Sequence, residues 1–245
     1  MARTDTLGNF LTDVAEAIRE KKGTSETIQA SQFDTEIANL PSGSADLDWQ
    51  AIGYNTRPQY INDDYDHAKD IYDNWDNSQT DLTNKFHDDK NLVIMPLVDT
   101  SNVTNMGYCF NGCSKLKNIP LLDTSNVTRM MYMFITCTEL QSIPLFDTKR
   151  VKETNYMFSA CKSLLTVPLL DLSSVTNMTR MFENCNNLTD TSLDNILQMC
   201  INATSYTGTK TLARLGLTSG FYPASRIEAL PHYQDFINAG WTIGY

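Results

Sequence analysis

The sequence has little positive charge and no long apolar run, and each absence excludes a class of protein. Its 245 residues hold 19 Lys and Arg against 29 Asp and Glu, which gives a formal net charge of -10. Proteins that bind nucleic acid through its phosphates need clustered Lys and Arg, so nucleic acid is not an expected partner. No segment approaches the roughly 18 apolar residues of a membrane span, so we expect no insertion into a membrane.

The first residues also lack the apolar stretch of a secretion signal. The start, "MARTDTLGNFLTDVAEAIREKKG", has acidic and polar residues where a signal peptide is apolar. We therefore expect a chain that is made in a cytoplasm and stays there unless lysis or a special route releases it.

Signatures of common active sites are missing too. The chain has no GxSxG, HExxH, GxxxxGK or GxGxxG, and its three histidines are scattered. We therefore predict no catalytic residue, no cofactor and no metal, and a protein that is not an enzyme. The acidic segment 46–90 places His67 and His87 among several Asp, which leaves a cation site conceivable. It lacks the Gly and the late Glu of a Ca²⁺ loop, and the simpler interpretation is a solvated acidic face.

What the chain does have is a strict repeat, whose period is the interval from Cys113 to Cys137. At this spacing a proline, an aspartate, a valine, a phenylalanine, a cysteine and a leucine each occur four times without an insertion. Asp89 stands in the cysteine column of a degenerate earlier unit. The predicted repeat core consists of Phe110, Cys113, Leu116, Phe134, Cys137, Leu140, Phe158, Cys161, Leu164, Phe182, Cys185 and Leu188.

One unit of this length cannot bury its own apolar side chains, whereas stacked units can. The repeat therefore predicts an α/β solenoid of short parallel strands and helical turns. In "LKNIPLLD", Ile119 and Leu121 have the spacing of a strand and should face the same way. In "NMTRMF", the spacing of Met178, Met181 and Phe182 predicts a helical turn towards the core. Residues "DTSNVT" should form the corner between them.

The cysteine column admits two interpretations. Stacked coils lie about 5 Å apart, which a disulfide could bridge. However, side chains in register point in parallel, cytoplasmic thiols stay reduced, and no CxxC or neighbouring His completes a zinc site. Packing as small apolar residues is the favoured interpretation, and a disulfide or metal role remains the alternative.

The segment "DTSNVTNMGYCFNGCSKLKNIPLLDTSNVTRMMYMFITC" resembles the BspA-like class of leucine-rich repeats, which occurs in bacterial surface proteins and in bacteriophage structural proteins. The segment "LTDVAEAIREKKGTSETIQASQFDTEIANL" resembles a helical module of phage tail, fibre and baseplate-associated proteins. The end, "LPHYQDFINAGWTIGY", resembles the segment that often follows the repeat in such proteins.

We accordingly predict four parts. Residues 1–40 form a helical attachment or assembly module, unless its two helices fold back onto the main domain. Residues 41–90 form a linker and N-terminal cap with the degenerate first coil, residues 91–194 the leucine-rich-repeat solenoid, and residues 195–245 the C-terminal cap.

The resemblance implies a non-enzymatic virion protein of a bacteriophage, as a tail-fibre, baseplate or head-fibre component that serves assembly, host recognition or both. It would be made in the host cytoplasm and located in the virion. Expected partners are other virion proteins and a host cell-surface polymer or protein, and a homotrimer is possible by analogy with phage fibres. The alternative is a bacterial cell-surface leucine-rich-repeat adhesin. A wall-degrading or sugar-processing enzyme is a third hypothesis.

Candidate contact residues are those that depart from the repeat. The third corner replaces "DTSNVT" by "DTKRVK", which places Lys149, Arg150 and Lys152 together in an acidic chain. Such a basic triplet suits an anionic polymer or an acidic subunit, although a solvated corner is the simpler interpretation. The other candidates occupy a variable column: Asn111, Ile135, Ser159 and Glu183.

Overall fold

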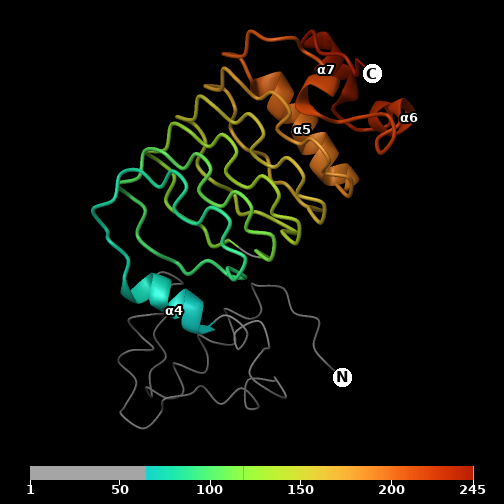
Figure 1. Ribbon diagram of the computed structural model, residues 1–245. Helices are drawn as coiled ribbons and strands as arrows, with labels where there is room; N and C mark the ends of the chain where they lie inside the picture. The colour runs from blue at the N-terminus through green and yellow to red at the C-terminus, as the bar shows by residue number, and fades with distance from the viewer. Residues whose placement is uncertain (1–64, 118, 245) are drawn as a thin grey trace, which may run out of the picture. The chain divides into compact units, whose positions relative to one another are not determined.

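The computed structural model describes residues 65–117 and 119–244 (Figure 1). The chain divides into two compact units, residues 1–63 and residues 64–245, and the description below concerns the second unit by itself. The predicted module of residues 1–40 lies outside the described residues, as does the part of the predicted N-terminal cap that precedes residue 65.

The described unit is built around a stack of coils in which each coil bonds to the next one in register. The backbone N–H of Thr104 donates to the carbonyl of Thr80 at 2.8 Å, and that of Thr128 donates to Thr104 at the same distance. Isolated parallel bridges join residues of one column, namely Asp81, Asn105, Arg129, Glu153 and Asn177. The structural period is therefore the period of the sequence repeat. Figure 1 shows these coils between helix α4 (Tyr65–Asp73) and the helices of the C-terminal part.

One side of each coil consists of overlapping turns. The N–H groups of Met133 and Ile135 donate to the carbonyls three residues earlier, at 3.3 Å each. In between, Tyr132 and Phe134 donate to carbonyls of the next coil at 3.0 and 2.9 Å. An α-helix would direct every N–H to the fourth residue before it. The predicted helical turns are therefore wrong here: alternate N–H groups bond within the coil and between coils.

Backbone angles explain how the turns follow one another so closely. Tyr132 has a φ of 58° and Thr136 a φ of 61°, and the equivalent positions of the neighbouring coils are also left-handed. A residue with positive φ in the third position is the hallmark of a type II turn. Residues three apart in such turns still approach each other, so the apolar spacing resembles that of a helix.

The opposite side of each coil is extended, but proline changes which side chains face inward. Ile119 is buried, Leu121 is 61% exposed, and Leu122 is buried. The N–H of Leu122 donates to the carbonyl of Pro120 at 2.9 Å, and Phe146 donates to Pro144 in the same way. This bond between residues i and i+2 closes a γ-turn, which breaks the alternation of a strand. The prediction that Ile119 and Leu121 face the same way is therefore wrong.

The N-terminal end of the stack is closed by aromatic packing. The phenylalanine column forms a continuous stack, with ring centroids 5.3 Å apart for Phe86 and Phe110. The ring of Trp75, which follows α4, stacks on Phe86 at 6.3 Å, and its Nε1 donates to the carbonyl of Asp99 at 2.8 Å. Trp75 thus covers the apolar face that the first coil would otherwise expose.

The C-terminal end is closed by a helix and by a segment that replaces the next coil. Helix α5 (Asp190–Asn202) begins where the Thr189 hydroxyl accepts a hydrogen bond from the Ser192 N–H, and so begins within the range predicted for the repeats. The short 3-10 helix η2 (Ala213–Leu215) supplies carbonyls to the last coil. The N–H of Phe182 donates to Leu215 at 2.9 Å.

Two further helices, α6 (Ala224–Glu228) and α7 (Tyr233–Asn238), complete this part of the chain. Trp241 is buried beside α7, with its ring centroid 5.5 Å from that of Tyr206 and 5.9 Å from that of Phe236. Over the described ranges, no helix has the length and apolar character needed to cross a membrane.

Candidate functional site

The repeat core forms the interior of the stack, and all twelve of its predicted residues are buried. Each cysteine thiol of the column donates to the carbonyl of a phenylalanine in the preceding coil. Cys137 donates to Phe110 at 3.1 Å, and Cys161 donates to Phe134 at 3.0 Å. All six cysteines are free. The column therefore packs and bonds to backbone, which a purely apolar side chain could not do.

The chemistry of these thiols is that of buried, unreactive groups. Burial raises the pKa of Cys113 to about 12 and that of Cys185 to about 12. The thiolate is the nucleophile and the metal ligand, so a raised pKa suppresses both activities. In the part of the chain that the structure describes, no three or more His, Cys, Asp or Glu side chains are grouped so that they could hold a metal ion.

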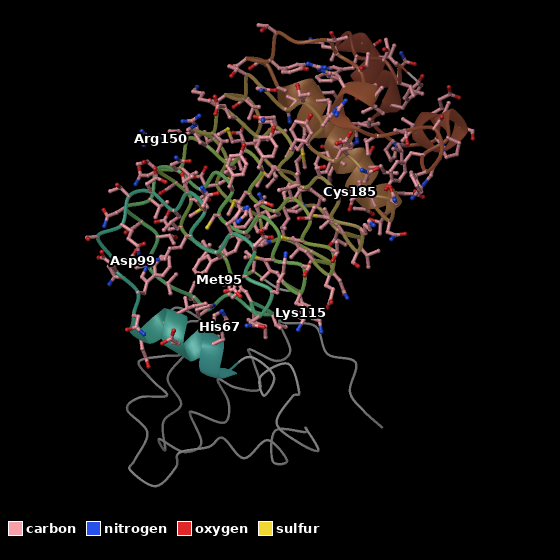
Figure 2. The ribbon with its side chains drawn as sticks, in the orientation of Figure 1. His67, Met95, Asp99, Lys115, Arg150 and Cys185 are labelled. Atoms are coloured by element: carbon pink, nitrogen blue, oxygen red, sulfur yellow. The ribbon has the colours of Figure 1, made fainter. Side chains whose placement is uncertain are left out.

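The histidines of the acidic segment lie within polar contact of aspartate side chains. His67 of α4 places Nε2 at 2.7 Å from Oδ2 of Asp89, the residue that replaces cysteine in the first coil. Lys90 Nζ lies 2.7 Å from Oδ1 of Asp88, and His87 Nδ1 lies 3.5 Å from Oδ2 of the same carboxylate. Figure 2 shows His67 at the end of the stack, where α4 lies. The His67–Asp89 pair connects α4 to the first coil.

The basic triplet Lys149, Arg150 and Lys152 lies on an exposed corner. Arg150 donates from Nη1 to the side-chain oxygen of Asn126 at 3.0 Å, which fixes the guanidinium over the preceding coil without neutralising it. None of the ion pairs among the described residues includes a member of the triplet. Arg150 and Asp99 lie along one edge of the stack and Lys115 along another (Figure 2).

The variable column is less uniform than the sequence suggests. Asn111, Ile135 and Glu183 are partly exposed, whereas Ser159 is only 4% exposed. The Ser159 hydroxyl lies 3.5 Å from Oε2 of Glu183 in the next coil. The choice of Ser159 as a contact residue is therefore wrong, because the small side chain is covered by its neighbours.

A tyrosine ladder on the turn side was not predicted. The rings of Tyr108, Tyr132 and Tyr156 are nearly parallel, with centroids 4.6 and 4.8 Å apart. The guanidinium of Arg180 continues the column at 5.8 Å from the Tyr156 ring. All three rings are half-buried. The signal that could have revealed the ladder is the recurrence of tyrosine at the period of the repeat.

Two further rows run side by side on the extended side. The leucine stripe consists of four exposed residues, Leu97, Leu121, Leu145 and Leu169. The aspartate row lies two residues further along each coil and is also exposed: Asp99, Asp123, Asp147 and Asp171. Each aspartate Oδ1 accepts the backbone N–H two residues later, at 2.9 to 3.1 Å. Donation from the Ser125 hydroxyl and N–H keeps the pKa of Asp123 below its ordinary value.

Comparison with known families agrees with the repeat architecture. Residues 80–196 match the family model described as "Mycoplasma protein of unknown function, DUF285", which covers a little under half of the chain. This segment belongs to a repeat-protein family. The DUF285 segment begins at Thr80, whose carbonyl accepts a backbone hydrogen bond from the next coil, and ends at Ile196 within α5. Neither a curated protein nor a solved structure gave a significant match.

Proposed function

We propose that the protein is a non-enzymatic structural component of a bacteriophage virion, in a tail fibre, baseplate or head fibre. In this proposal the stacked coils form a BspA-like solenoid that presents its outer surface to a neighbouring virion protein or to the host.

The observation that carries the proposal is a regularly packed interior combined with an outer surface whose corner residues vary from coil to coil. Several interior columns keep one residue type through four coils, as the buried phenylalanines and cysteines do. On the exterior the leucine and aspartate columns are also uniform, but the corner position changes: it holds Ser125 in one coil and the exposed Lys149 in the next. Such a scaffold supports binding through an extended outer surface rather than through a single active site.

The assignment to a virion depends on the resemblance of the two end segments to phage proteins. Residues 1–40 would attach the protein to the particle, and the C-terminal segment would close the solenoid. In α7 and the residues after it, Phe236 and Trp241 are buried, as a closing segment requires.

Within this proposal the basic triplet is the candidate host contact. Lys149, Arg150 and Lys152 are exposed, and their charge suits an anionic cell-surface polymer or an acidic neighbouring subunit. A Lys149→Ser, Arg150→Asn, Lys152→Thr variant would restore the residues of the other corners. We expect the variant to fold normally and to bind host cells or its virion neighbour more weakly than the unchanged chain.

The experiment that tests the proposal is mass spectrometry of particles. A lysate from cells that produce the phage would be separated on a density gradient, and peptides of the chain would be quantified in each fraction. We expect the chain to co-sediment with the particles at a fixed, many-copy ratio to a major virion protein. Recovery only in the soluble fractions would overturn the virion assignment.

The alternative function is a bacterial cell-surface adhesin with the same repeat surface. The description of the matching family as a Mycoplasma protein is the observation that favours it. Labelling of the chain on intact bacteria that release no particles would support this alternative. Release of soluble sugars or peptides from host walls by the pure protein would instead contradict the non-enzymatic assignment.

A further inference from the structure

The leucine stripe is an exposed apolar surface that the packing of the coils does not explain. Leu97 is 41% exposed, Leu121 61%, Leu145 59% and Leu169 40%. Each is followed by a buried apolar residue, and each belongs to the same column of the repeat. Isolated exposed leucines are common in proteins, but four in register form a continuous apolar stripe.

The register of the extended side shows that the stripe runs along the stack. The N–H of Lys117 donates to the carbonyl of Val93 at 2.9 Å, and that of Leu165 donates to Gln141 at the same distance. Both bonds join residues one repeat apart, on the stretch of chain that leads into the stripe. The leucines therefore follow one another at the spacing of the coils, which the stacked rings give as 4.6 to 5.7 Å.

One border of the stripe is charged, and the other is not. The aspartate row lies on one side, and the pKa values of Asp99, Asp123 and Asp171 are lowered because the serine two residues later donates hydrogen bonds to each carboxylate. The half-buried proline column lies on the other side. A partner must therefore offer apolar side chains in a row with positive charge along only one edge.

We propose that the leucine stripe and the aspartate row form a docking site for an amphipathic α-helix that carries an apolar stripe bordered on one side by Lys or Arg. A helix rises about 5.4 Å per turn. One apolar residue on each helical turn can therefore contact one leucine on each coil. The coils are spaced by about 4.8 Å, so over four coils the helix and the stripe differ in length by only about 2 Å. Apolar residues at positions i, i+4, i+7 and i+11 of the helix contact the four leucines in order.

An extended strand would not satisfy the same spacing. Side chains on one face of a strand recur at intervals of roughly 6.6 Å, which is longer than the spacing of the coils. Over four leucines the strand would therefore fall out of register with the stripe by a whole coil. A second copy of this chain would bring its own aspartate row to the interface, with no row of cations to meet the first. The stripe thus favours a helix with a basic border over both of these occupants.

The test uses the full chain and designed peptides long enough to form about four helical turns. The first peptide carries Leu at i, i+4, i+7 and i+11 with Lys along one border, the second replaces each Lys by Glu, and the third shuffles the first. Binding would be measured by fluorescence anisotropy at several salt concentrations. We expect the lysine peptide to bind about tenfold more tightly than either control, a difference that about 1.4 kcal/mol produces.

Substitutions in the chain localise the binding. Leu121→Ser with Leu145→Ser should weaken binding of the lysine peptide about tenfold or more, whereas Phe221→Ser, at an exposed apolar residue of the C-terminal part, should leave it unchanged. Both variants should have the same Tm as the parent chain because the substituted side chains are exposed.

The contribution of charge is tested with a matched pair of variants. Asp123→Asn with Asp147→Asn keeps the Oδ1 acceptors and should weaken binding and flatten its salt dependence. The control, Glu228→Gln with Asp235→Asn, removes the same charge from the exposed C-terminal part and should have no effect.

Two results would overturn the proposal. One is equal binding of the lysine peptide to the parent and to the double leucine variant. The other is a dimer of the parent chain, seen by sedimentation, that the double leucine variant dissociates, since a second copy would then occupy the stripe.

Discussion

Replacement of Gly216 by alanine would test how the C-terminal segment closes the stack. Gly216 has a φ of 88°, in the left-handed region, and an added Cβ would lie 2.5 Å from Cα of Glu183 and 2.7 Å from its N. The left-handed backbone costs a residue with a Cβ about 1–2 kcal/mol. Contact with backbone at this distance must in addition displace the segment from the last coil.

The displacement would weaken bonds that hold the end of the stack. The N–H groups of Arg180 and Phe182 donate to Arg214 and Leu215 at 2.8 and 2.9 Å, and each such bond contributes about 0.5–1.5 kcal/mol. We therefore expect Gly216→Ala to lower the free energy of unfolding by about 2–4 kcal/mol. This should appear in urea titrations and as a fall in Tm on the order of 10 °C.

Two glycines of the same part of the chain serve as controls. Gly240 has a φ of 84° but nothing within 4 Å of an added Cβ. Gly240→Ala should therefore lower the free energy of unfolding only through the left-handed backbone conformation, by about 1–2 kcal/mol. Gly220 has neither a positive φ nor a close neighbour, so Gly220→Ala should be neutral or slightly stabilising. If Gly216→Ala destabilised no more than Gly240→Ala, the close approach to Glu183 would be refuted.

Three other predictions concern the interior, the corner and the turns. At pH 8 the native protein should not react with a thiol reagent within minutes, whereas the unfolded chain exposes all six cysteines; rapid labelling of native Cys113 would contradict its burial. Because hydrogen bonds from Ser125 lower the pKa of Asp123 below 3.8, this carboxylate should stabilise the fold above about pH 4 and lose that effect as the pH falls through the lowered pKa. Asp123→Asn should therefore flatten the fall in Tm below about pH 4, and an unchanged slope would count against this. Since Tyr132 has a φ of 58°, Tyr132→Gly should be more stable than Tyr132→Ala by about 1 kcal/mol in urea titrations, and the opposite order would disprove the left-handed turn.

The period and the interior of the stack were predictable because the buried residues themselves carry the repeat. A column such as Phe110 and Phe134 packs ring against ring, so each coil requires the same residue at the same place. The conformation of the turns was not predictable from spacing. Apolar residues at i, i+3 and i+4 fit a helical turn and overlapping β-turns equally well. The positive φ of Tyr132 was also not predictable, because tyrosine is not a residue type that favours the left-handed region.

The candidate surfaces were predictable only in part, for similar reasons. The exposure of the basic triplet followed from its departure from the repeat. The leucine stripe was missed because period-2 alternation places Leu121 on the same face as Ile119, which is buried, whereas the γ-turn from Pro120 to Leu122 turns Leu121 outward. Ser159 was misassigned because variation along a column does not show whether a small side chain is covered.

The most direct test of the central claim is imaging of the purified phage particle at a resolution that resolves side chains. The account predicts density for the stacked coils at a regular set of positions on the particle, with phenylalanine columns inside the coils and residues 1–40 at the attachment point. A complete particle with every density assigned to other chains would contradict it.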